Sequence, residues 1–72
     1  MTAELQYKMK AFGLTDRDLK EDWVYCEGER ILQKIAVKNG NAYLITGVNI
    51  SKINTIEFLK IKVIAIEPLQ KN

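Results

Sequence analysis

The dipeptide Asn39-Gly40 stands between two stretches in which apolar and polar residues alternate. Asn-Gly readily adopts the positive φ angles of a two-residue β-turn, so this pattern predicts a β-hairpin. With such a turn Lys38 lies opposite Asn41, and opposed residues share one face of a sheet. Counting outward from the turn therefore divides the side chains of residues 31–48 into two sets, one on each face.

One of the two sets is almost wholly aliphatic, whereas the other mixes aromatic, cationic and small side chains. The aliphatic set comprises the pairs Val37/Ala42, Ile35/Leu44, Gln33/Thr46 and Ile31/Val48. The mixed set comprises the pairs Lys38/Asn41, Ala36/Tyr43, Lys34/Ile45 and Leu32/Gly47. Because a slip of one residue would exchange the faces, this separation supports the register. We expect the aliphatic face to be the inward one.

The sequence on either side of the hairpin predicts two further strands. Glu27-Gly28 offers a second two-residue turn, which would place Val24 opposite Ile31 and Trp23 opposite Leu32. Alternation over residues 55–67 predicts a final strand, and Pro68 should end it because proline cannot donate to a sheet ladder. All nine isoleucines follow residue 30, as expected for a mainly β region.

The N-terminal region has the spacing of an amphipathic helix. Apolar residues recur at intervals of four and three between polar ones, at Leu5, Met9 and Phe12. This spacing predicts a helix over residues 3–12, with Thr2 as its N-cap and Gly13 as its left-handed C-terminal residue. Thr15 can cap a second, short helix whose first turn carries Asp16 and Asp18.

These elements predict an α+β fold. An N-terminal helix, with the short second helix, packs on a roughly four-stranded antiparallel meander. A chain of 72 residues without a linker should form one small domain over residues 1–72. A winged-helix fold is the alternative, with residues 3–22 as a helix pair and the Asn39-Gly40 hairpin as the wing. It is weaker, because its short recognition helix would present acidic side chains to a polyanion.

The residue inventory argues against an enzyme. The chain has no histidine and a single cysteine, Cys26, so neither a Cys-His nor a Ser-His-Asp site can be built. The same shortage excludes the common structural zinc sites, and the four scattered glycines form no phosphate-binding loop. We therefore expect no catalytic residues, no metal, no cofactor and no small-molecule ligand.

Composition also bears on location. No apolar run approaches the roughly 20 residues that cross a bilayer, and no signal-peptide stretch opens the chain. One cysteine cannot form an internal disulfide, which agrees with a reducing compartment. The expected location is cytoplasmic, without membrane association.

The mixed face is the predicted binding surface. Its aromatic and cationic residues, extended by the first strand, are Trp23, Tyr25, Arg30, Lys34, Lys38 and Tyr43. A solvent face should be polar nearly throughout, and an apolar patch on a monomer usually marks a partner. Tyr, Trp and Arg are also enriched at binding hot spots. The sequence thus predicts a small interaction module that self-associates or docks on a protein partner through this face.

Two other interpretations of the mixed face stay open. It could bind single-stranded nucleic acid, with bases stacked on the aromatic rings and phosphates near the lysines. However, the isoelectric point of about 8.8 is lower than that of strongly basic nucleic-acid-binding domains. Alternatively, another segment of the chain covers the mixed face and forms a second small core, with lysine stems at its rim.

Overall fold

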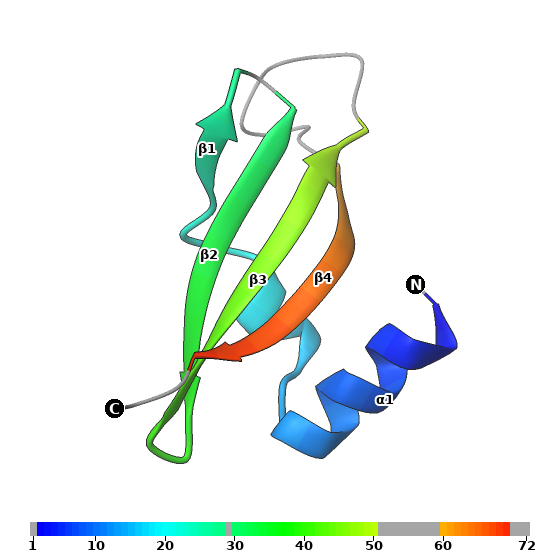
Figure 1. The fold of residues 1–72 in the computed structure, drawn as a ribbon, viewed down its shortest axis with the longest axis vertical. Coiled ribbons are helices and arrows are strands. Elements are labelled where there is room, and N and C mark those ends of the chain that lie inside the picture. Colours follow the sequence, from blue (N-terminus) through cyan, green and yellow to red (C-terminus); the bar gives the residue numbers. More distant parts are fainter. Residues whose placement is uncertain (1, 29, 51–59, 70–72) are drawn as a thin grey trace.

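The computed structural model describes residues 2–28, 30–50 and 60–69. Figure 1 shows its elements, which follow one another as α1 (Ala3–Phe12), a 3₁₀ helix η1 (Asp16–Leu19), β1 (Val24–Glu27), β2 (Ile31–Lys38), β3 (Asn41–Asn49) and β4 (Ile61–Leu69). The strands form one antiparallel sheet in the order β1-β2-β3-β4. This arrangement confirms the predicted α+β fold with a four-stranded meander.

The ends of α1 are those that the sequence predicts. The Oγ1 atom of Thr2 accepts a hydrogen bond from the backbone N–H of Leu5 at 3.2 Å. At the other end Gly13 takes a left-handed conformation with φ of 73°, which glycine adopts without steric cost. Both caps satisfy backbone groups that a helix end would otherwise leave without partners.

The second helix is a short 3₁₀ segment, and its N-terminus is closed by side-chain contacts. The carboxylate of Asp18 accepts hydrogen bonds from the backbone N–H of Thr15 at 2.8 Å and from its hydroxyl at 3.1 Å. Only four residues are helical, which is typical of 3₁₀ segments. Packing of Leu19 against the core holds η1 in place.

The central hairpin has the predicted turn and register. Asn39 and Gly40 have φ angles of 53° and 80°, which fit a turn with both central residues left-handed. All eight pairs of β2 and β3 are those counted from the sequence, from Lys38 opposite Asn41 to Ile31 opposite Val48. The division of side chains between two faces is therefore confirmed.

Two predictions about the outer strands are wrong. Val24 lies opposite Gln33 and not Ile31, because a register shift between Tyr25 and Glu27 and a longer connection replace the predicted tight turn. Pro68 does not end the last strand but lies within β4. Proline is tolerated there because β4 is an edge strand. The part of the predicted strand over residues 55–59 lies outside the described residues.

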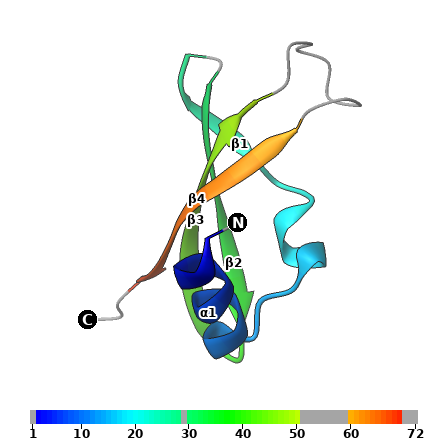
Figure 2. The ribbon, with the colours of Figure 1, turned by 90° about the vertical axis from the view of Figure 1, so that its right-hand side faces the viewer.

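The helices lie on one side of the sheet and bury the mixed face. Seen on edge in Figure 2, η1 stands to one side of the strands, and α1 packs against β4. The core comprises Leu5 and Leu14 with the sheet residues Ala36, Tyr43, Ile45, Val63 and Ile66. The prediction that the aliphatic face is inward is therefore wrong, since Lys34 is 7% exposed and its neighbour Ile35 is 58% exposed. We call the covered side the inner face and the aliphatic side the outer face.

Of the helices in the described part of the chain, neither has the length and apolar character needed to cross a membrane.

Candidate functional site

Two of the predicted site residues are buried. Tyr43 is 7% exposed, and its ring stacks on that of Phe12 with centroids 4.5 Å apart and planes 20° from parallel. The side chain of Lys34 is buried on the same face, between Leu32 and Ala36 on β2. No described buried side-chain nitrogen or oxygen lacks a hydrogen-bond partner. Coverage of the mixed face agrees with one of the three interpretations of the sequence, but the described core lies on this face alone and is not a second core beside an aliphatic one.

Trp23 is half-buried and also packs against the core. Its Nε1–H donates to the backbone carbonyl of Leu19 at 2.6 Å, so the indole is tied to the end of η1. Its ring lies over Gly47 on β3, where a Cβ atom would come within 3.2 Å of two ring carbons and would overlap Ile61 Cγ2. Gly47 therefore provides the space in which the indole of Trp23 packs.

Lys38 takes part in a contact that links the hairpin to η1. Its Nζ lies 3.2 Å from Oδ2 of Asp18, the carboxylate that also caps Thr15. The pKa of Asp18 lies below its ordinary value of 3.8, mainly because of the hydrogen bond from the Thr15 backbone and further because of Lys38. Lys38 thus acts in this structure as an internal ion-pair partner.

The six predicted residues consequently do not form one open surface. Tyr25, with 44% exposure, and Arg30 remain accessible near the β1–β2 end of the sheet. Tyr43 and Lys34 lie beneath the helices. Two of the six predicted binding residues, Lys34 and Tyr43, are therefore buried, and one ring face of Tyr43 packs against Phe12.

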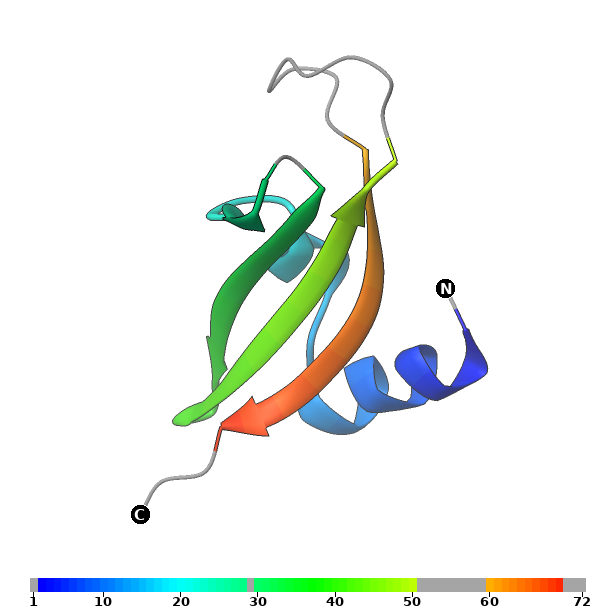
Figure 3. The same ribbon diagram turned by 45° about the horizontal axis from the view of Figure 1, so that its top comes forward.

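The outer face is an apolar surface that no described element covers. Figure 3 looks onto this side of the sheet, with η1 behind the strands. The exposed fractions are 64% for Val24, 58% for Ile35 and 67% for Val37. Around them lie the half-buried Ile31, Ala42, Leu44 and Val48. Of the eight outer positions on β2 and β3, none is charged.

The polar groups at the centre of the outer face bind one another. Gln33 Nε2 donates to Thr46 Oγ1 at 3.2 Å, directly across the hairpin. The thiol of Cys26 on β1 donates to Gln33 Oε1 at 3.0 Å. Because burying an unpaired polar group costs free energy, these internal bonds make the centre of the face suitable for burial against another surface.

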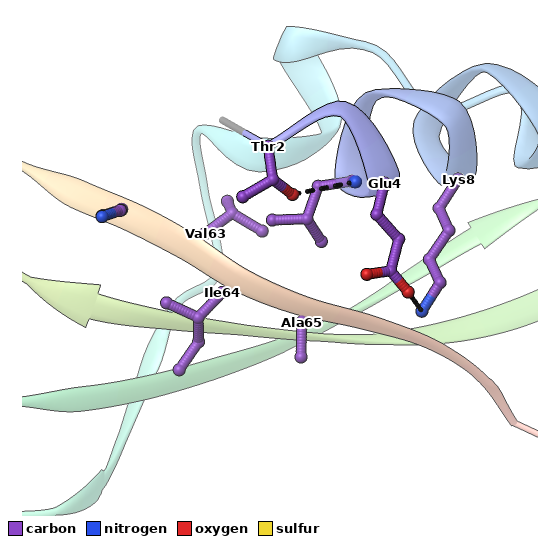
Figure 4. Close-up of a pocket in the computed structure, with 8 residues that line it drawn as sticks. Thr2, Glu4, Lys8, Val63, Ile64 and Ala65 are labelled. Carbon is purple, nitrogen blue, oxygen red and sulfur yellow. Dashed lines mark hydrogen bonds and ion pairs between the residues drawn. The ribbon is translucent and has the colours of Figure 1, made fainter.

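Charges on this face occur on the edge strand β4. Lys62 lies opposite Val48, and Glu67 lies opposite Leu44. Between them a register shift leaves Ile64 unpaired, and Figure 4 shows Ile64 and Ala65 pointing away from α1. Ile64 is 47% exposed and adds to the outer face. The outer face therefore has apolar side chains on either side of the central Gln33/Thr46 pair, with one cation and one anion on β4.

A hollow of about 320 Å³ lies between α1 and β4 on the opposite side of the sheet (Figure 4). Val63 points into it, and the N-cap residue Thr2 with Glu4 and Lys8 of α1 lines its other wall. The two charged side chains of this wall lie 3.9 Å apart as an ion pair. Among the described residues no three acidic, cysteine or histidine side chains gather as a metal site. Lys62 of β4 also lines this hollow.

The outer face escaped sequence reasoning because its residues resemble a core. Ile35, Val37 and Leu44 have the composition of a buried sheet face, and the hairpin register grouped them correctly. The sequence nevertheless indicated that one apolar face would stay open. The amphipathic helix has room to cover one face only, so one of two apolar faces had to remain open.

Comparison with known proteins yields no match for this chain among protein-family models, curated proteins or solved structures.

Proposed function

We propose that this chain is a non-catalytic interaction module that self-associates by burying the outer face of its sheet. One observation carries the proposal. Ile35 and Val37 are more than half exposed on a sheet face that no described element covers. A β-sheet with one apolar face open to water is typical of a structure that gains a partner.

The size of the outer face corresponds to a protein interface smaller than the standard one. Strands about 4.8 Å apart and about 26 Å long give a sheet face on the order of 500 Å², and pleating makes the accessible area larger. Standard protein interfaces bury about 800 Å² on each partner. The lack of charge on β2 and β3 also matches interface centres, which are depleted in charged residues.

A second copy is the occupant that best fits these properties. Sheets pack face to face about 10 Å apart when both inner surfaces are apolar, and an identical copy supplies such a surface. Self-association also adds stability to a small chain, whose single core rarely supplies more than about 3–5 kcal/mol. The absence of histidine and the lone cysteine support a non-catalytic role.

The test is the mass of the chain in solution over a concentration series, measured by sedimentation equilibrium. We expect the mass to rise from 8.3 kDa toward twice that value. Ile35→Lys places a charge on the outer face and should raise the dissociation constant by about tenfold or more. Circular dichroism should show that the diluted variant keeps the wild-type fold, because the side chain points to solvent in the monomer.

Tyr7→Lys is the matched control. Tyr7 is 74% exposed on α1, on the other side of the sheet, so the same substitution there should leave the dissociation constant unchanged. A wild-type chain that stays at 8.3 kDa up to about millimolar concentration would overturn the proposal. Equal weakening by both variants would also contradict it.

A further inference from the structure

We infer that the free edge of β4 is closed to the addition of another β-strand, and that Pro68 and the irregularity at Ile64 close it. An edge strand presents unpaired N–H and C=O groups, which can pair with a strand of a second chain. β4 is such an edge, because no described strand pairs with its other side. Closure of this edge goes beyond the proposed function and does not depend on it, because monomer and dimer both carry the β4 edge.

The direction of the backbone groups on β4 follows from two hydrogen bonds of β3. The N–H of Asn49 donates to the carbonyl of Arg30, on the β2 side. The N–H of Ile50 donates to the carbonyl of Lys60, on the β4 side. Backbone groups alternate in direction along a strand, and β3 pairs with β2 without a register shift. Even-numbered residues of β3 therefore face β4, and odd-numbered ones, including Tyr43, face β2.

Pro68 lies at a position of β4 that faces the free edge. Its partner on β3 is Tyr43, whose backbone groups face β2. Opposed residues of an antiparallel pair face either toward each other or away from each other, so the nitrogen of Pro68 points away from β3. Proline there costs the sheet no hydrogen bond between β3 and β4. An arriving strand, however, finds no N–H donor at Pro68.

The irregularity at Ile64 disturbs the spacing of the other groups along this edge. Val63 and Ile66 also face the free edge, because their partners on β3 are odd-numbered residues. They are three residues apart, whereas a regular strand presents such groups at every second residue. Ile64 has no partner on β3, and its side chain points to the same side as that of Ala65, as in a β-bulge. A regular strand therefore cannot stay in register with both sides of the irregularity.

The opposite edge of the sheet is short. β1 has four residues, and its pairing with β2 contains a register shift. Short strands, bulges and proline are the devices by which proteins avoid edge-to-edge association. Because both edges are unsuited to strand addition, the outer face is the side of the described sheet that remains for a second copy. Association there ends at two chains, since a face covered by one copy cannot bind a third.

Hydrogen exchange of the wild-type chain tests the direction of the backbone groups. The side chains of Val63 and Ile66 are 7% and 0% exposed, so burial alone would favour slow exchange of their amides. Because these N–H groups face the free edge, we expect them to exchange at least about tenfold faster than those of Ala65 and Glu67, which face β3. NMR spectra recorded in deuterated water measure each amide. Equal protection of the two sets would overturn the inference.

A variant with an opened edge tests the closure itself. Pro68→Val supplies the missing N–H at an exposed position. Deletion of Ile64 makes the outward groups recur at every second residue, because Val63 and Ala65 already pair with consecutive residues of β3. We expect the chain with both changes to form assemblies larger than two chains, measured by sedimentation at concentrations at which the wild type does not exceed twice 8.3 kDa.

The matched control carries N-methylvaline at position 68 in the chain that lacks Ile64, made by chemical synthesis. It keeps the valine side chain and lacks the N–H, so we expect its association to be at least about tenfold weaker than that of the opened variant. If the opened variant associates no further than the wild type and this control, Pro68 and Ile64 do not close the edge and the inference is wrong. The exchange measurement needs the wild type only, so it decides the question even where the deletion prevents folding.

Adding Ile35→Lys to the opened variant separates this inference from the proposed function. The outer face of that chain is blocked, so it should associate through its edge alone and stop at twice 8.3 kDa. A wild type that stays monomeric would overturn the proposed self-association, whereas association of the opened variant would still support a closed edge. A wild type that dimerises through β4 in spite of Pro68 would overturn the inference.

Discussion

The ring of Phe12, at the end of α1, lies stacked on the ring of Tyr43 near the start of β3, with centroids 4.5 Å apart. Through this contact the last turn of α1 packs against β3. Since Tyr43 is 7% exposed and belongs to the core cluster, the pair belongs to the folding energetics of the monomer. Stacked aromatic pairs add about 0.5–1.5 kcal/mol to the stabilisation from burial alone.

Truncation of this ring should therefore unfold the chain. Tyr43→Ala removes a buried aromatic side chain at a cost of about 3–5 kcal/mol, comparable to the whole stability of a small domain. Tyr43→Phe keeps the stack and should cost much less. Urea unfolding followed by far-UV circular dichroism measures both. Tyr7→Ala, on the exposed side of α1, is the control and should change stability by less than about 0.5 kcal/mol.

A contrary outcome would be informative. A Tyr43→Ala chain that stays fully folded and loses only its ability to associate would return Tyr43 to the role of a binding residue.

Gly47 should resist substitution for a steric reason. A Cβ atom there would overlap Ile61 Cγ2 and crowd the indole of Trp23, so Gly47→Ala should destabilise the chain by about 1–3 kcal/mol. Without that overlap, alanine in a strand would stabilise by restricting the unfolded chain. The change in melting temperature of Gly47→Ala distinguishes destabilisation by the steric overlap from stabilisation by alanine.

The partner in the overlap can be checked with a double-mutant cycle. Ile61→Ala removes the overlapped methyl group, so the double variant Gly47→Ala/Ile61→Ala should lose less stability than the two single losses together. If the stability losses of the two single variants simply add in the double variant, the loss caused by Gly47→Ala does not arise from overlap with Ile61.

The Asp18 carboxylate should make stability depend on acid pH. Its pKa in the folded chain lies below the ordinary 3.8, because the Thr15 backbone and Lys38 favour the charged form. A depressed carboxyl pKa contributes stability that is fully present above the unfolded pKa and is lost as pH falls through the folded pKa. Stability should therefore decline below about pH 4, and part of that decline belongs to Asp18.

Asp18→Asn isolates this contribution. At pH 7 the variant should be less stable by about 0.5–1 kcal/mol, because it loses the ion pair with Lys38 and the charged cap. Its melting temperature should also depend less on pH between 2 and 5. Asp16→Asn, in the same short helix, controls for removal of a nearby acidic charge. Identical pH profiles for wild type and Asp18→Asn would refute the assignment.

Local chemistry made much of the fold predictable. The Asn39-Gly40 turn determined the register of β2 and β3, because few other sequences accept two adjacent left-handed residues. Thr2 and Gly13 determined the ends of α1 for similarly local reasons. The β1 register was less predictable, since the connection after Glu27 is longer than a two-residue turn and the strand has an irregularity.

By itself the sequence determined which residues share a face, whereas only the tertiary structure decided which face is covered. Because side chains alternate along a strand, Lys34 and Ile35 lie on opposite sides of β2. This alternation does not indicate which of the two sides the helix covers. That choice depends on the path of the chain from α1 through η1 into β1, and on side chains distant in sequence that fit together, as Phe12 does with Tyr43. Packing of those rings closed the mixed face and left the aliphatic one open, because one short helix and one 3₁₀ turn can cover a single side of a sheet.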